Sequence, residues 1–244
     1  MIWREYLRLR TQSRVIEHDL EALRRVRRRG FKPRLIFDIG SSTGFWSLHV
    51  RRIFPEARFV LFEPLLSVRA HYRDMFPGLL AQQKNFQVEP IALSDTNGTV
   101  RLHETFDGWG STILDWKYTE LTKQVHDIPA QTLASWIKNH QSEIPQFIKL
   151  DTQGSELRIL KGLGPLLGEV ELLLIETWQV RGYAETNPLL NEIQSFLEDF
   201  QFTLYEVTGI QPSPGRPIGH DCLFVNERSP LARWHWEDQP AAKA

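Results

Sequence analysis

Two glycines that follow a hydrophobic run mark the first place in the chain where a ligand could bind. The run covers residues 35–39, and Gly40 and Gly44 come between it and a helical pattern that opens at Phe45. Glycine lets the backbone turn sharply from strand to helix and lets a ligand approach closely. A dinucleotide fingerprint would need glycine at Ser42 and Phe45, and a phosphate loop would need Gly-Lys-Ser/Thr. The segment therefore favours a ligand with a nucleoside but no phosphates.

A carboxylate at the end of the next hydrophobic run fits the same ligand. Glu63 directly follows residues 58–62. An acidic residue about 20 positions beyond the first glycine of such a loop is placed to accept hydrogen bonds from both ribose hydroxyls. We therefore expect Glu63 to bind the ribose.

Four short motifs follow one another along the chain. They are Asp38-x-Gly40-x-x-x-Gly44, Phe62-Glu63-Pro64, Ala92-Leu93-Ser94-Asp95, and Ile148-Lys149-Leu150-Asp151-Thr152-Gln153-Gly154-Ser155-Glu156 with Leu160-Lys161-Gly162 after it. Together they resemble the FkbM family of S-adenosylmethionine-dependent methyltransferases, and the similarity runs from about residue 35 to residue 225.

The resemblance implies an α/β fold of the Rossmann-like class I methyltransferase type. Its seven-stranded sheet is mostly parallel with the last strand antiparallel, and helices cover both faces. The implied cofactor is S-adenosylmethionine. The residues implied to hold it are Asp38, Gly40, Ser41 and Gly44 near the methionine part, Glu63 and Pro64 at the ribose, and Ala92, Leu93, Ser94 and Asp95 beside the adenine.

The resemblance also implies a reaction, since most family members with an assigned activity methylate hydroxyls of sugars or natural products. One position departs from the family pattern, because Gln153 stands where the family usually has glutamate. The expected function is thus O-methylation of a glycan or small molecule. The alternative is a catalytically impaired module that binds the donor and acts through protein interaction.

Methyl transfer to a hydroxyl requires that the protein align the reactants, exclude water and accept the hydroxyl proton. Asp151 and Glu176 close neighbouring predicted strands. His220 and Asp221 open the antiparallel strand beside them, so the four groups could converge on the donor. His220 suits a general base because imidazole titrates near working pH, and Asp151 suits one if its neighbours raise its pKa. Lys149 is expected to face away from Asp151 and to pair with a carboxylate.

Acceptor recognition is expected from residues 107–127, an irregular stretch. Trp109 stands between two glycines, which gives a movable loop with a flat apolar face. The substrate-binding candidates are Trp109, Ser111, Thr112, Gln153 and Arg181. No metal site is expected, with Mg²⁺ held by Asp151 and Glu176 as the minority alternative.

Hydrophobic runs and helical patterns alternate from residue 34 onward, which is typical of a sheet with helices on both faces. Strands are expected at residues 35–39, 58–62, 87–93, 147–150, 171–176, 202–207 and 221–225. Helices are expected at residues 45–54, 67–76, 133–139, 155–163 and 189–200. A Pro/Gly-rich loop at residues 209–219 replaces a helix between the last two strands, so these should pair as a hairpin.

Charge divides the 244-residue chain, whose formal net charge is −1. Residues 1–34 hold 11 Lys+Arg against 4 Asp+Glu, and the remainder holds 18 against 26, which disfavours nucleic-acid binding. The single cysteine favours a reducing compartment, and no run is long and apolar enough to span a bilayer, so a cytoplasmic location is expected.

An apolar stripe at helical spacing runs through the basic segment. Its members are Ile2, Tyr6, Leu9, Ser13, Ile16, Leu20 and Leu23. We expect residues 1–33 to form an amphipathic helix before a methyltransferase domain at 34–227 and a flexible tail at 228–244. The helix would pack on the domain or pair with a copy of itself through residues 2–26, and contact with anionic lipid is the alternative.

Overall fold

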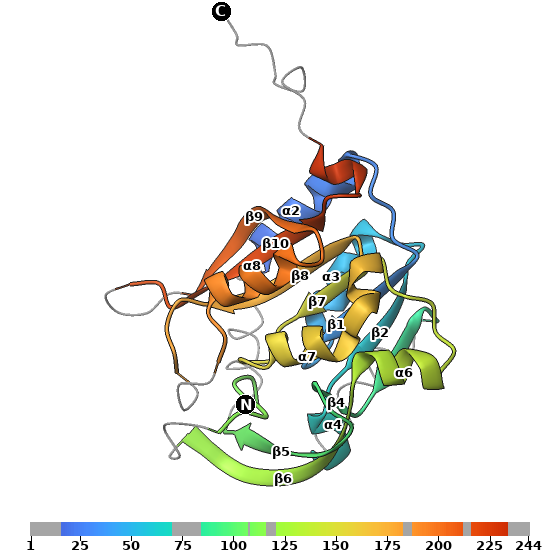
Figure 1. Ribbon diagram of the computed structural model, residues 1–244. Coiled ribbons are helices and arrows are strands. Elements are labelled where there is room, and N and C mark those ends of the chain that lie inside the picture. The colour runs from blue at the N-terminus through green and yellow to red at the C-terminus, as the bar shows by residue number, and fades with distance from the viewer. Residues whose placement is uncertain are drawn as a thin grey trace, which may run out of the picture.

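Seven strands form the main sheet, in the order β3-β2-β1-β7-β8-β10-β9 (Figure 1). The computed structural model describes residues 16–69, 84–106, 108–115, 121–182, 187–211 and 216–233. The strands of this sheet are β1 (Leu35–Ile39), β2 (Arg58–Phe62), β3 (Phe86–Glu89), β7 (Phe147–Leu150), β8 (Leu172–Trp178), β9 (Phe202–Gln211) and β10 (Gly219–Asn226). β10 runs antiparallel to both of its neighbours, whereas β3, β2, β1, β7 and β8 pair in parallel. This confirms the sheet that the resemblance implies.

Helices cover both faces of the sheet, as expected. α2 (Glu17–Arg28) and α3 (Phe45–Ile53) pack on one face, and α6 (Leu133–Asn139), α7 (Glu156–Leu163) and α8 (Leu190–Glu198) pack on the other. All five residues of β1 are buried, which explains its continuous hydrophobic run. Because side chains alternate along a strand, Ile36 joins the core under α2 and α3, whereas Phe37 joins the core under α6 and α7.

A second sheet corrects two of the sequence predictions. It contains β4 (Ala92–Leu93), β6 (Thr122–Gln131) and β5 (Gly98–Thr105) in that order. The single strand expected at residues 87–93 is wrong, since β3 belongs to the main sheet and β4 pairs with β6. Residues 122–127, expected to be irregular, lie in β6, whose mixed polar and exposed side chains hide the alternation of a half-buried strand.

The helix expected at residues 67–76 also differs. α4 covers only Leu65–Val68, and residues 70–83 lie outside the described part of the chain. The hairpin of β9 and β10 is confirmed, with β9 continuing to Gln211. In the ranges given above, no helix is long and apolar enough to cross a membrane.

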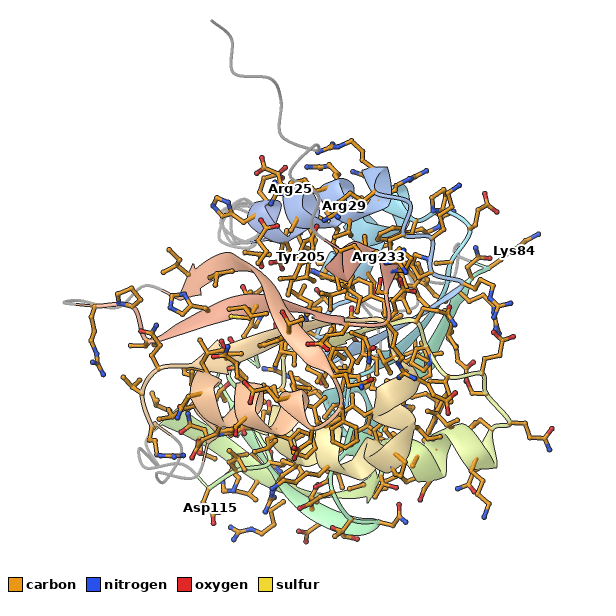
Figure 2. The ribbon with its side chains drawn as sticks, turned by 45° about the horizontal axis from the view of Figure 1, so that its top comes forward. Arg25, Arg29, Lys84, Asp115, Tyr205 and Arg233 are labelled. Carbon is orange, nitrogen blue, oxygen red and sulfur yellow. The ribbon has the colours of Figure 1, made fainter. Side chains whose placement is uncertain are left out.

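The amino-terminal helix α2 is fixed to the domain by a buried face and by its arginines. Leu23 and Val26 are fully buried. Arg25 forms an ion pair with Glu206 of β9, and Arg29 donates to the hydroxyl of Tyr205 at 3.0 Å. Figure 2 shows Arg25 and Arg29 reaching toward this edge of the sheet, and Figure 1 shows α2 beside β9.

Arg29 also contacts a residue near the other end of the described chain. Its second terminal guanidinium nitrogen, Nη2, donates to the carbonyl oxygen of Arg233 at 2.6 Å (Figure 2). Between Arg233 and β10 lies the short 3-10 helix η3 (Pro230–Ala232), whose Leu231 is buried in the core beneath α2. Residues 1–15 and 234–244 lie outside the described part of the chain.

Candidate active site

A cavity of about 510 Å³ opens where the central strands of the main sheet end. Its walls come from the carboxyl ends of β1, β2 and β7, from β8 and β10, from the start of α2, and from residues 108–113. This is the edge at which open α/β sheets bind their ligands. Most of the residues singled out in the sequence meet here.

Gly40 lies in one wall of the cavity, at a position where only glycine fits. Its φ is +76°, and a Cβ at this position would overlap the backbone carbonyl of Asp151. The amides of Gly40 and Ser41 both donate to the carbonyl oxygen of Phe62, at 3.0 and 3.1 Å. The glycine loop is therefore held between the ends of β2 and β7, with its backbone facing the cavity.

Glu63 is the most firmly held side chain of this wall. Its carboxylate accepts hydrogen bonds from the backbone amides of Ser42 at 2.7 Å and Leu65 at 2.9 Å. Burial raises the pKa of Glu63 to about 7, although the two amide donors oppose this rise. Each carboxylate oxygen retains a lone pair, so the side chain can still accept hydrogen bonds from a ligand. Pro64 lines the cavity beside it.

The four residues implied to lie beside an adenine divide into two pairs. Ala92 and Leu93 line the cavity together with Ile91. Ser94 and Asp95 are not among the lining residues, and the Ser94 hydroxyl donates to Asp95 at 3.0 Å. The structure thus brings only the apolar pair to the cavity wall.

Two further predicted cofactor residues act from behind the wall. Asp38 is fully buried, accepts a hydrogen bond from Ser47 at 2.6 Å, and does not line the cavity. Gly44 has φ of +72° at the start of α3 and is likewise absent from the lining. Asp38 thus holds α3 through Ser47, and Gly44 turns the chain from the loop into α3.

Lys149 corrects one sequence prediction and confirms another. Residues two apart on a strand share a face, and the ammonium of Lys149 lies 3.2 Å from Asp151 and 3.5 Å from Asp38. It therefore pairs with carboxylates as expected but does not face away from Asp151. Burial alone would lower the pKa of Lys149, yet Asp151 and Asp38 outweigh burial and raise it, so the ammonium stays charged.

Gln153 bridges the two carboxylates that were predicted to act in catalysis. Its amide nitrogen donates to Asp151 at 3.2 Å and to Glu176 at 3.0 Å. The Thr112 hydroxyl donates to the backbone carbonyl of Gln153 at 2.8 Å, which fixes the segment. An amide has two protons for two acceptors, whereas an ionised glutamate has none. The glutamine therefore suits this position geometrically.

Glu176 and Asp221 bring two further carboxyls to the cavity. They stand opposite each other on β8 and β10, and both line the cavity. Burial raises the pKa of each carboxyl well above its ordinary value, and the neighbouring Asp151 raises both further.

Asp19 is a cavity residue that sequence reasoning missed. It projects from α2, is almost fully buried, lines the cavity and accepts a hydrogen bond from the Thr208 hydroxyl. Burial raises the pKa of Asp19 to about 6, although Thr208 opposes the rise. The available signal was an acidic residue between Ile16 and Leu20, on the apolar side of the helix.

Two predicted site residues lie elsewhere. His220 is not among the lining residues, and its Nε2 hydrogen-bonds to the Gln179 side chain. Neighbouring residues on a strand point to opposite faces, which is why Asp221 reaches the cavity and His220 does not. The Arg181 guanidinium donates to the Asn187 carbonyl at 2.7 Å and pairs with Glu192, away from the cavity lining.

Trp109, Ser111 and Thr112 do line the cavity. Trp109 remains 38% exposed, while Ser111 accepts a hydrogen bond from the Thr105 amide at 3.1 Å. Trp46 and Trp178 also contribute to the lining. Among the residues that the structure describes, no group of three His, Cys, Asp or Glu side chains is arranged to hold a metal ion.

The sheet order, with a cavity lined by a glycine loop, Glu63 and a cluster of carboxyls, is that of the Rossmann-like class I methyltransferase fold. The model of the methyltransferase FkbM domain matches residues 38–204. The chain belongs to the FkbM methyltransferase family. α2 and its Asp19 lie before the matched residues.

Individual relatives are distant. The methyltransferase sdnD of Sordaria araneosa is 24% identical over 205 residues, which cover 69% of this chain and 73% of that protein. The FkbM methyltransferase structure from Methylobacillus flagellatus KT is 19% identical with a TM-score of 0.45, covering 80% of this chain and 43% of that one. The magnesium protoporphyrin IX methyltransferase of Synechocystis, solved with bound SAM, is 10% identical with a TM-score of 0.50, covering 88% of this chain and 79% of that one. The likeness to the Synechocystis structure shows that this chain has the same fold.

Proposed function

We propose that this protein transfers a methyl group from S-adenosylmethionine to a hydroxyl of a sugar or of a natural-product small molecule. One observation carries the proposal: a single cavity is lined both by the glycine loop and Glu63, here called the donor end, and by Asp151, Glu176 and Asp221, here called the acceptor end. A donor and an acceptor could therefore lie in contact within it.

The residues at the first end fit the donor. Gly40 lets the loop pack against the backbone of Asp151 and so brings the loop to the cavity wall, and Glu63 has free lone pairs for two ribose hydroxyls. Ile91, Ala92 and Leu93 offer an apolar wall suited to the adenine ring. When bound, S-adenosylmethionine would supply an activated methyl group on a positively charged sulfur.

Asp151 is our candidate for the group that accepts the acceptor's proton. Its side chain is 38% exposed and faces the cavity, whereas His220 does not line it. Lys149 and Gln153 hold one carboxylate oxygen each, at 3.2 Å, which fixes the direction in which the remaining lone pairs point. Alignment of this kind contributes to the rate as much as the proton transfer does.

The carboxyls around Asp151 suit an acceptor that carries several hydroxyls. Burial raises the pKa values of the Glu176, Asp221 and Asp19 carboxyls above their ordinary values, which favours the protonated form of each. A protonated carboxyl donates a hydrogen bond and an ionised one accepts, so such a group matches either side of a hydroxyl. Trp109 adds an apolar face on which a sugar ring could stack.

Calorimetric titration with S-adenosylmethionine and then S-adenosylhomocysteine tests the donor assignment. We expect binding of both in the micromolar range. Sugars and hydroxylated natural products would then be screened by following formation of S-adenosylhomocysteine. Donor binding without turnover on any hydroxylated acceptor would favour the impaired donor-binding module, and absence of donor binding would overturn the proposal.

A further inference from the structure

A second hollow, of about 290 Å³, lies between α2 and α3 and is lined by basic side chains. Its lining residues are Leu20, Arg24, Arg27, Arg28, His49, Arg52 and Ile53. None of these is acidic. None of them lines the catalytic cavity, to which α2 contributes Asp19 and the preceding Ile16.

Helix geometry explains why these basic side chains meet. Arg24, Arg27 and Arg28 are three and four residues apart, so they lie on one face of α2, and His49 and Arg52 are three apart on α3. The two helices pack against each other with Leu20 and Ile53 nearly buried between them. The hollow therefore has an apolar floor and cationic walls.

Stabilisation of the helices accounts for only part of this arrangement. Arg27, Arg28 and Arg52 lie in the last turns of their helices, where positive charge is favourable. That effect does not require both helices to direct their charges into one hollow, and like charges at such spacing repel one another. Within the described ranges, Arg24 has an ion pair, with Glu17, whereas none is recorded for Arg27, Arg28 or Arg52.

We propose that this hollow binds a phosphate group of a ligand. Guanidinium groups bind phosphate oxygens through two parallel hydrogen bonds, and several of them can surround one phosphate. A concave site of this volume fits a compact anion better than it fits a flat acidic protein surface. This site is separate from the donor and acceptor positions, and its existence does not depend on the proposed function.

One contact connects the hollow to the catalytic cavity. The His49 ring packs on Phe45 with ring centroids 4.3 Å apart, and its Nδ1 is hydrogen-bonded to the Phe45 carbonyl at 2.9 Å. Phe45 itself lines the catalytic cavity. A bound phosphate would thus hold α2 and α3 together beside the catalytic cavity.

The phosphate could belong to a soluble molecule or to a lipid headgroup, and two probes separate these sources. The full chain is titrated calorimetrically with inorganic pyrophosphate, and it is sedimented with phosphatidylcholine vesicles with or without phosphatidic acid. The test variant is Arg27→Gln/Arg28→Gln/Arg52→Gln. The control variant, Arg101→Gln/Arg158→Gln/Arg216→Gln, removes the same charge from exposed positions outside both cavities.

We expect at least about tenfold weaker binding of one probe in the test variant and less than about twofold change in the control. Pyrophosphate binding would identify a soluble ligand, and binding to the anionic vesicles alone would identify a lipid. A third variant, Arg27→Lys/Arg28→Lys/Arg52→Lys, keeps the charge and loses the paired hydrogen bonds, so it should bind at an intermediate strength even if the glutamine variant unfolds. Equal weakening in test and control variants, unchanged binding in both the lysine and glutamine variants, or no binding of either probe would overturn the proposal.

Discussion

The donor end and the acceptor end of the catalytic cavity are built in different ways. At the donor end, Gly40 and Glu63 are held by backbone groups of two adjacent strands and their loops. At the acceptor end, Asp19, Asp151 and Asp221 come from α2, β7 and β10, which are far apart in sequence. The first end is therefore a local structure, and the second exists only once the whole domain has packed.

The two ends also differ in electrostatics. The Glu63 carboxylate meets amide donors, whereas the acceptor carboxyls meet one another around a single Lys149. Burial, together with the neighbouring carboxylates, raises the pKa values of Glu176 and Asp221 well above their ordinary range. Substitutions at the donor end should accordingly abolish donor binding, while those at the acceptor end should change turnover, acceptor affinity and pH dependence.

The largest effect is expected from Glu63→Ala. The substitution removes the acceptor of the ribose hydroxyls and leaves the amides of Ser42 and Leu65 without a partner. Loss of two hydrogen bonds to a charged group costs about 3–6 kcal/mol, so donor affinity should fall by at least about 100-fold. Calorimetry with S-adenosylhomocysteine measures this directly.

Glu63→Gln is the matched control, since it keeps one acceptor oxygen and should lose affinity to an intermediate extent. The melting temperature of both variants shows whether the loop is still folded. Donor binding of wild-type strength in a folded Glu63→Ala variant would contradict the ribose assignment.

Asp151→Asn should separate the two ends most clearly. Removing a general base lowers turnover by about 10²–10⁴-fold. Donor affinity should change less than about threefold, because Asp151 presents only its backbone carbonyl to the Gly40 loop. Parallel measurements of kcat and of the donor Kd test this. An equal loss of kcat and of donor affinity would make Asp151 a donor-binding residue and would contradict the difference between the donor end and the acceptor end.

Gln153→Glu tests why this chain departs from the family pattern. The substitution places a further carboxyl between Asp151 and Glu176 and removes the amide protons that join them. We expect roughly tenfold lower turnover at neutral pH, with partial recovery relative to wild type as the pH falls and the new carboxyl becomes protonated. Gln153→Met, which has the length but no donor, should lower turnover without that pH dependence. Activity of Gln153→Glu equal to wild type across the pH range would show that the bridge has no role.

Asp19→Asn tests whether α2 belongs to the acceptor end. The folded-state pKa of Asp19 is raised from 3.8 to about 6, so ionisation destabilises the folded protein. This cost is absent well below pH 4, grows between about pH 4 and 6, and is complete above that range. The variant should therefore gain melting temperature relative to wild type at pH 8, by roughly 2–4 °C or more, and little at pH 4.

The same variant should raise the KM for the acceptor by about fivefold while the donor Kd stays unchanged. Asp199→Asn, at an exposed position away from the cavity, is the control and should alter neither quantity. A change in donor affinity without a change in acceptor KM would show that Asp19 belongs to the donor end and would contradict this prediction.

The difference between the donor end and the acceptor end also explains which residues of this site could be predicted from the sequence. The Gly40 loop and Glu63 follow from spacing within one strand–loop–strand unit, where local hydrogen bonds decide the structure. Asp19 could not be predicted, because the periodicity of α2 shows which face is buried but not which cavity that face meets. His220 and Asp221 were both expected at the cavity, yet only Asp221 lines it, because which of two neighbouring residues faces the cavity depends on the pairing register of β10 with β8.

The smallest effect is expected from Trp109→Ala, at the open side of the acceptor end. Trp109 keeps 38% of its surface exposed, so an acceptor ring that stacks there would gain only part of the contact that a buried ring provides. The acceptor KM should rise by about two- to threefold, with little change in kcat or donor affinity. Phe106→Ala is the matched control, because Phe106 is 69% exposed on a neighbouring segment and does not line the cavity. If both variants raise the KM equally, the effect belongs to the flexibility of this segment, and the acceptor end would then consist of the buried carboxyls alone.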